Sequence, residues 1–151
     1  MLDMTSKLCE DEEYTHALKF YENILQAESD NIGVIIDYGV TLQNLGQYNQ
    51  ALTMYDRALN LQPKNMNALI NKGSVLHTLE KYSEAISCYN IALNINKNNP
   101  IALAYKGLCL GETGNIQLAI KHFKKALSID NECELAEISL NTANGIVKSY
   151  T

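Results

Sequence analysis

The chain has 151 residues, of which 46% are hydrophobic and 19% are charged, and its formal net charge at pH 7 is −5. This composition excludes a disordered chain and indicates one folded domain or one short repeat array. An acidic protein is poorly suited to nucleic acid, whose phosphates attract basic side chains, and the apolar stretches are too short to cross a membrane. We therefore expect neither nucleic acid nor a membrane as a binding partner.

The N-terminus and the cysteines indicate where the protein works. The acidic run Glu10–Glu13 lies where a secretory signal would be apolar. The four cysteines, Cys9, Cys88, Cys109 and Cys133, form no CxxC pair, so the sequence does not support a metal site or a disulfide-exchange site. We expect free thiols in the reducing cytoplasm, with Cys88 and Cys109 partly buried, and no cofactor.

A regular internal repeat organises the whole sequence. Similar segments begin at Tyr14, Tyr48, Tyr82 and Ile116, each 34 positions after the one before. A fixed period of this size indicates stacked helical hairpins rather than a globular core. We expect a single array over residues 1–151, with a partial repeat at 1–31, repeats at 32–65, 66–99 and 100–133, and a capping helix at 134–148.

The partial repeat is expected to contain a short first helix, a turn, and a second helix that begins at Tyr14. Glu12 stands at the position that glycine occupies in other repeats, so the segment Glu10–Glu13 is interpreted as a solvated turn. A short first helix would leave apolar side chains uncovered at this end of the array, Met4 and Leu8 among them.

The repeat at 32–65 shows the pattern most completely. Residues 32–45 and 48–61 each carry apolar side chains on one helical face. Gly46 supplies the left-handed backbone that ends the first helix, and Pro63 stops the second. The short connection makes the two helices antiparallel, and small residues let their axes approach closely. The residues expected at this contact are Gly39, Ala51 and Ala58, with the rings of Tyr38 and Tyr55 beside them.

The same positions recur in the next two repeats as Gly73, Ala85, Tyr89 and Ala92, and as Gly107, Ala119, Phe123 and Ala126. This pattern resembles the tetratricopeptide repeat (TPR) family, whose repeats have the same period. The resemblance implies an all-α fold, a right-handed superhelical solenoid of antiparallel helix pairs. In that family the first helices of the pairs line a concave groove, which commonly binds an extended peptide or a partner helix.

The resemblance assigns one set of side chains to the inner face of this groove. They form an apolar strip flanked by polar groups and contain no lysine or arginine, and such a strip usually marks a protein contact. The predicted partner-binding residues are Ile36, Asp37, Val40, Asn44, Ile70, Asn71, Ser74, His77, Tyr105 and Leu108. The predicted capping helix adds Leu135, Ile138, Ser139 and Thr142 to the same face.

An alternative remains open for several of these side chains. Ile36, Val40 and Ile70 would instead pack between neighbouring repeats or against the capping helix. Asn71 would then be an ordinary surface amide, rather than a group that hydrogen-bonds the backbone of a ligand, and Tyr105 would not form a platform for one.

Some TPR proteins hold the C-terminal carboxylate of heat-shock chaperones in a clamp of lysine, arginine and asparagine side chains. Only Asn71 matches a clamp asparagine, and a carboxylate needs charge-assisted donors. A chaperone carboxylate clamp is therefore not expected, and the expected ligand is an apolar or amphipathic segment. The positions that would be cationic in a clamp hold Leu2, Ile36, Ile70, Ala104 and Leu108.

We expect no catalytic residue and no metal site. The sequence has no phosphate-binding glycine loop, and His16, His77 and His122 belong to different repeats. The sequence thus predicts a non-catalytic protein–protein interaction module. Two alternatives are a scaffold that self-assembles through its groove or its uncovered N-terminal end, and a regulatory subunit of an enzyme encoded elsewhere.

Overall fold

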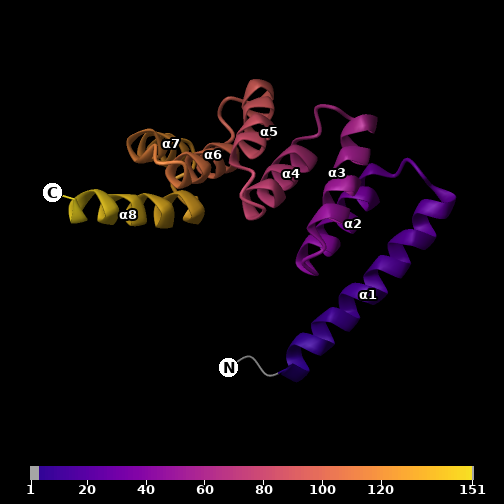
Figure 1. Ribbon diagram of the computed structural model, residues 1–151. Coiled ribbons are helices and arrows are strands. Elements are labelled where there is room, and N and C mark those ends of the chain that lie inside the picture. Colours follow the sequence, from indigo (N-terminus) through magenta and orange to yellow (C-terminus); the bar gives the residue numbers. More distant parts are fainter. Residues whose placement is uncertain (1–3, 151) are drawn as a thin grey trace. The chain divides into compact units, whose positions relative to one another are not determined.

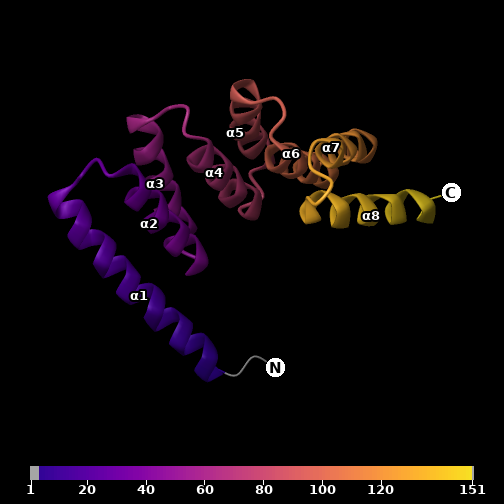
Figure 2. The same ribbon diagram turned by 180° about the vertical axis from the view of Figure 1, so that it is seen from behind.

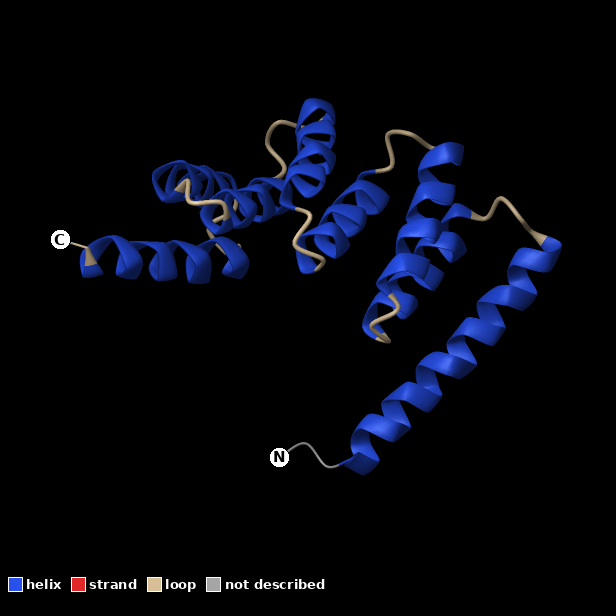
Figure 3. Ribbon diagram, in the orientation of Figure 1, coloured by secondary structure: helices blue, strands red, loops and turns tan. Residues whose placement is uncertain are grey.

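The computed structural model describes residues 4–150, with side chains from Glu10 onward. Over these residues only short connections interrupt the helices, which confirms the predicted all-α fold (Figure 3). The helices are α1 (Met4–Ala27), α2 (Ile32–Asn44), α3 (Tyr48–Leu61), α4 (Met66–Thr78), α5 (Tyr82–Ile95), α6 (Pro100–Glu112), α7 (Ile116–Ile129) and α8 (Glu134–Ser149), as Figure 1 shows. The side chains of Leu2, Met4, Leu8 and Cys9, named above, lie outside the described residues.

The N-terminal helix is longer than the sequence indicated. Helix α1 runs without a break from Met4 to Ala27, as both Figure 1 and Figure 2 show, so the predicted turn at Glu10–Glu13 is wrong. Glutamate is a good helix former, and it lacks the freedom of glycine to adopt a left-handed backbone. The acidic segment therefore continues the helix.

Three later hairpin turns each contain one residue with a left-handed backbone. These residues are Gly46 (φ 75°), Glu80 (φ 60°) and Gly114 (φ 91°). The N–H of the following residue donates to a carbonyl five residues back, at 2.8–2.9 Å, which closes the helix end. The left-handed backbone costs a non-glycine residue roughly 1–2 kcal/mol. Glu80 bears this cost, whereas Glu12, at the same repeat position, stays helical.

An asparagine begins the first helix of each of three successive pairs. The Oδ1 atom of Asn31 accepts a hydrogen bond from the N–H of Val34 at 3.2 Å. Asn65 and Asn99 make the same bond to the residue three positions later, both at 3.0 Å. Such a cap contributes about 1 kcal/mol. Cys133 takes this position before α8, where no side-chain cap forms. The 34-residue period is thus repeated in the hydrogen bonds that cap these helices.

The chain divides into two compact units, the first ending at Val75 and the second beginning at Leu76. In the first unit, Gly39 brings α2 and α3 together, because a Cβ atom at Gly39 would lie 2.6 Å from the Tyr55 ring. Ala51, Tyr55 and Ala58 on α3 are completely buried. The small residues therefore form the expected close contact.

Tyr38 does not fill this contact, contrary to the expectation. Its hydroxyl donates to Oε1 of Glu22 on α1 at 2.8 Å, and its ring centroid lies 6.5 Å from that of Tyr21. Successive side chains on a helix point about 100° apart, so Tyr38 does not share the direction of Gly39 toward the Tyr55 ring. Tyr38 instead joins α2 to α1.

In the second unit, Gly107 has the same role as Gly39. A Cβ atom there would lie 2.6 Å from the ring of Phe123 on α7. Helix α8 completes two apolar clusters with α6 and α7, through Ala136 in one and Ala143 in the other. Both views show α8 lying along α6 and α7 (Figures 1 and 2).

The cysteines with described side chains are buried. The side chains of Cys88, Cys109 and Cys133 are 7%, 0% and 8% exposed. Cys88 and Cys109 were expected to be partly buried, and their burial is more complete than that.

Candidate protein-binding surfaces

The predicted groove residues on α2 differ widely in exposure. Ile36 is 9% exposed and belongs to the core, while Val40 is half-buried. Asp37 and Asn44 are exposed. The packing alternative therefore describes Ile36 better than the ligand-binding interpretation does, and Asp37, Val40 and Asn44 are open to solvent on one face of α2.

The predicted groove residues on α4 within the first unit, Ile70, Asn71 and Ser74, are half-buried. Ser74 takes part in packing between helices, because its hydroxyl accepts a hydrogen bond from Nε2 of Gln43 at 3.4 Å. The Oε1 atom of Gln43 in turn accepts from the Tyr55 hydroxyl at 2.9 Å. This chain of hydrogen bonds links α4, α2 and α3, so Ser74 has a structural role.

In the second unit, His77 and Tyr105 contact aromatic rings of the protein itself. His77 meets Tyr82 edge to face at 5.5 Å, and Tyr105 stacks on Tyr89 at 5.7 Å with the rings 10° from parallel. Both side chains remain half-buried. One face of the Tyr105 ring is thus already occupied.

Leu108 lies at the edge of an open, largely apolar cavity of about 340 Å³ in the second unit. The cavity, which we call the α6–α8 cavity, is formed by side chains of α6, α7 and α8. Its lining residues are Leu108, Gly111, Glu112, Ile116, Ala119, Phe123, Ile138, Ser139, Thr142, Ala143 and Ile146.

Two isoleucines of α8 give this cavity an apolar rim open to solvent. Ile138 is 64% exposed and Ile146 is 41% exposed. With Thr142 they recur every four residues, so they lie along one side of α8. Ile138 and Thr142 were placed on the inner face by their position in the repeat, but neither entered the predicted binding set, and Ile146 was missed altogether. Counting one repeat period onward from Glu112 would have found Ile146.

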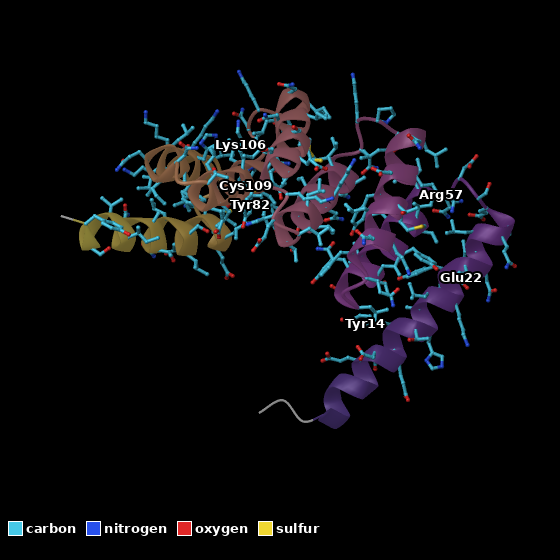
Figure 4. The ribbon with its side chains drawn as sticks, in the orientation of Figure 1. Tyr14, Glu22, Arg57, Tyr82, Lys106 and Cys109 are labelled. Atoms are coloured by element: carbon cyan, nitrogen blue, oxygen red, sulfur yellow. The ribbon has the colours of Figure 1, made fainter. Side chains whose placement is uncertain are left out.

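The α6–α8 cavity has a charged lining residue, and the nearby Cys109 thiol on α6 is protonated at neutral pH. Of the described residues that line it, only Glu112 is charged. Cys109 on α6 is fully buried and does not line the cavity; burial, followed by the Glu112 carboxylate, raises the pKa of its thiol to about 11. Since the thiolate is the nucleophile, Cys109 is inert at neutral pH. Figure 4 labels Cys109 and its neighbour Tyr82.

A second open cavity, of about 300 Å³, lies in the first unit among α1, α2 and α3. Its lining includes Glu22, Tyr38 and Arg57, and Figure 4 shows Glu22 and Arg57 on their separate helices. Burial, followed by the hydrogen bond to Glu22, raises the pKa of Tyr38 to about 12. Arg57 donates to the carbonyl of Ser29 just beyond the end of α1. The Tyr38–Glu22 bond ties α1 to α2, and the Arg57–Ser29 bond ties α3 to the residues that follow α1.

The described part of the chain holds neither a metal site nor a membrane span. Among the side chains from Glu10 to Tyr150, no three acidic, histidine or cysteine groups come close enough together to bind a metal ion. None of the helices between Met4 and Ser149 has the length and hydropathy needed to cross a membrane.

Two family models match the chain. The one described as "Anaphase-promoting complex, cyclosome, subunit 3" matches residues 10–92, more than half of the sequence, and the one described as "Tetratricopeptide repeat" matches residues 102–133. The chain belongs to the tetratricopeptide repeat family. None of the curated proteins matches this TPR chain.

Solved structures resemble the TPR chain over most of its length. "Crystal structure of MamA" has a TM-score of 0.77 and 22% identity, and covers 95% of this chain and 84% of that one. A MamA fragment from Desulfovibrio magneticus RS-1 has a TM-score of 0.78 and 24% identity, with 89% and 76% covered. The first TPR of Spaghetti (RPAP3), bound to the HSP90 peptide SRMEEVD, has a TM-score of 0.72 and 20% identity, with 78% and 93% covered. At these identities the likeness concerns the fold.

Proposed function

We propose that this TPR chain is a non-catalytic binding module that holds an apolar or amphipathic segment of another protein in the α6–α8 cavity. The observation that carries the proposal is the exposed apolar rim formed by Ile138 and Ile146. Exposed apolar area around a pocket usually marks a protein contact, because covering it removes that area from water.

The chemistry of the cavity favours a neutral or basic segment. Glu112 is the only charged residue among the described lining residues, and Thr142 adds a hydroxyl at the rim. The RPAP3 domain binds an acidic peptide, SRMEEVD. An acidic peptide would meet the like charge of Glu112 without a lysine or arginine in the lining to offset it. The proposed ligand therefore places apolar side chains against Ile138 and Leu108, and its polar or basic groups near Glu112.

The predicted contacts on α2 and α4 remain part of the proposal for the first unit. Asp37, Val40 and Asn44 are accessible there, and Ile70 and Asn71 are half-buried. A ligand on this face would place apolar groups against Val40 and Ile70, and Asn44 would hydrogen-bond its backbone.

A displayed library of random peptides tests the proposal at the α6–α8 cavity. Peptides would be selected on the wild-type chain and then measured against Ile138→Asp, in which a charge interrupts the apolar rim. Since Ile138 is 64% exposed, the variant should fold. We expect selected peptides to be rich in apolar residues and to lose roughly tenfold or more in affinity for Ile138→Asp.

Ile91→Asp is the matched control. Ile91 lies on α5, is 47% exposed and does not line the cavity, so it receives the same charge at a similar exposure. Peptides that bind wild type and Ile91→Asp equally well but fail on Ile138→Asp support the proposal. Equal binding to both variants, with circular dichroism unchanged, would reject the cavity as the binding site.

A further inference from the structure

Helix α1 carries the side chains that are buried against a companion helix in other repeats, but on α1 these side chains are only half-buried. On α3, Ala51, Tyr55 and Ala58 are 0% exposed. The residues one repeat period earlier, on α1, are Ala17, Tyr21 and Ile24, and all three are only half-buried. The pairing face that is fully buried on α3 is therefore only partly buried on α1.

Phe20 is a large apolar side chain exposed on the same face of α1. It is 62% exposed, whereas Cys88, at the same repeat position on α5, is 7% exposed. In the second unit this position lies against the first helix of its pair, because a Cβ atom at Gly107 would come within 3.2 Å of the Cβ of His122. Phe20 therefore belongs to the face that a companion helix covers elsewhere.

The other repeats define the helix that fits such a face. In α2, Gly39 meets the tyrosine ring of α3, with Ile35 four residues before it and Leu42 three residues after it, at 0% and 2% exposed. Helix α6 repeats this arrangement with Leu103, Gly107 and Leu110. A companion for α1 needs the same pattern, with glycine opposite Tyr21, because a larger residue would collide with the ring.

Helices α2, α6 and α8 of a second copy do not supply this helix. Helices α2 and α6 already cover α3 and α7. Helix α8 has no following helix among the described residues, but at the three positions that correspond to the pattern of α6 it carries Glu137, Asn141 and Asn144. Asn141 would collide with Tyr21, and Glu137 would be buried without a partner charge.

The charge of α1 defines one end of the companion. Helix α1 extends beyond Tyr14, the repeat position at which α3 begins, and this extension carries the carboxylates of Glu10, Asp11, Glu12 and Glu13. A companion packed antiparallel, as in the other pairs, places its C-terminal end beside these four groups. Lysine or arginine there would complement both the carboxylates and the companion's own helix dipole.

From these observations we propose that the face of α1 formed by Ala17, Phe20, Tyr21 and Ile24 binds an amphipathic helix of a partner protein. The partner helix lies antiparallel to α1, carries glycine opposite Tyr21 between two large apolar residues, and ends in basic side chains. This surface lies in the first unit, so the Ile138→Asp experiment on the α6–α8 cavity does not test it.

A synthetic helix tests the proposal directly. The probe is a fluorescein-labelled peptide with the sequence of residues 31–46, which contains α2, followed by three lysines. Fluorescence anisotropy should show saturable binding to the full chain. We expect binding to weaken roughly tenfold or more in the protein variant Phe20→Arg, and equally in a probe with Gly39→Leu. Replacing the lysine tail by glutamates should also weaken binding, most strongly at low salt.

Thr15→Arg is the matched protein control. Thr15 is exposed on the side of α1 away from Phe20 and should accept the same charge with no loss of binding. No saturable binding to wild type, or equal affinities for Phe20→Arg and Thr15→Arg, would overturn the proposal. So would a concentration-dependent dimer in light scattering that Phe20→Arg converts to monomer, because the second copy would then occupy this face.

Discussion

Helices α1 and α3 belong to the same unit, occupy the same position in successive repeats and share much of their pattern, yet only α3 is buried on its pairing face. Tyr55 on α3 is 0% exposed beneath Gly39, while Tyr21 on α1 is half-buried. Each hairpin is too small to bury its apolar face without a companion. The comparison shows that burial in this chain depends on the presence of a companion helix, and not on the pattern of one helix.

The largest expected difference is for removal of the aromatic ring. Tyr55→Ala should lower the free energy of unfolding by about 3–5 kcal/mol, because it leaves a cavity in a fully buried contact. Tyr21→Ala should cost less than about 1.5 kcal/mol, because the half-buried ring leaves no closed cavity. Urea denaturation followed by circular dichroism measures both. Equal losses would mean that α1 is covered as fully as α3.

Adding volume instead of removing it should also destabilise α3 more than α1. Ala51→Leu should destabilise by about 1–3 kcal/mol, because its side chain is completely enclosed between α2 and α3. Ala17→Leu should change stability by less than about 0.5 kcal/mol, because its neighbours leave room. Thermal unfolding of the two variants gives the comparison, and a large loss for Ala17→Leu would contradict it.

The buried hydroxyls extend the comparison to the second unit. The Tyr55 hydroxyl donates to Gln43 at 2.9 Å, whereas the Tyr89 hydroxyl has no hydrogen-bond partner among the described residues. Tyr55→Phe should therefore cost about 1 kcal/mol, and Tyr89→Phe should be neutral or stabilising, since it removes an unpaired buried group. Phe123 already occupies this repeat position on α7. A loss for Tyr89→Phe as large as for Tyr55→Phe would show that its hydroxyl is satisfied.

The smallest expected effect is on the pH dependence of stability, through the pKa of His122. His122 occupies the repeat position of Phe20, and burial, with help from Lys106 and Lys125, lowers its pKa below the usual value of about 6.5. The folded state thus prefers neutral His122. As pH falls below about 6.5 the unfolded state binds the proton first, so stability declines until the folded pKa is passed.

Nuclear magnetic resonance titration checks this lowered pKa. In the variant Phe20→His, the new histidine on the uncovered face of α1 should keep a pKa near its ordinary value. The variant His122→Gln should lose the part of the pH dependence of unfolding that falls below about pH 6.5. A lowered pKa at position 20 would indicate that this face is covered.

The comparison also bears on the predictions from the sequence, of which the turn at Glu10–Glu13 was wrong. A glutamate at the glycine position of the hairpin predicts a turn at Glu12, and the same substitution does form a turn at Glu80. Both residues are glutamate, so the residue at this position does not by itself decide between a turn and a continuous helix. Repeat position assigned Ile36 and Tyr105 to the inner face and left open whether they contact a ligand or pack within the protein. Ile36 is 9% exposed and Tyr105 stacks on Tyr89, and their role in binding stays a prediction.

The sequence by itself determined the period of the repeat, the helix pairs and the close contact at Gly39, because backbone preference and residue size act over a few neighbouring positions. Only the tertiary structure decided that α1 is continuous, that its Tyr21 face is incompletely covered, and that Ile138 and Ile146 border an open cavity. These properties depend on whether a second helix lies against the first. Residues with the same local pattern are buried where a companion is present and exposed where it is absent.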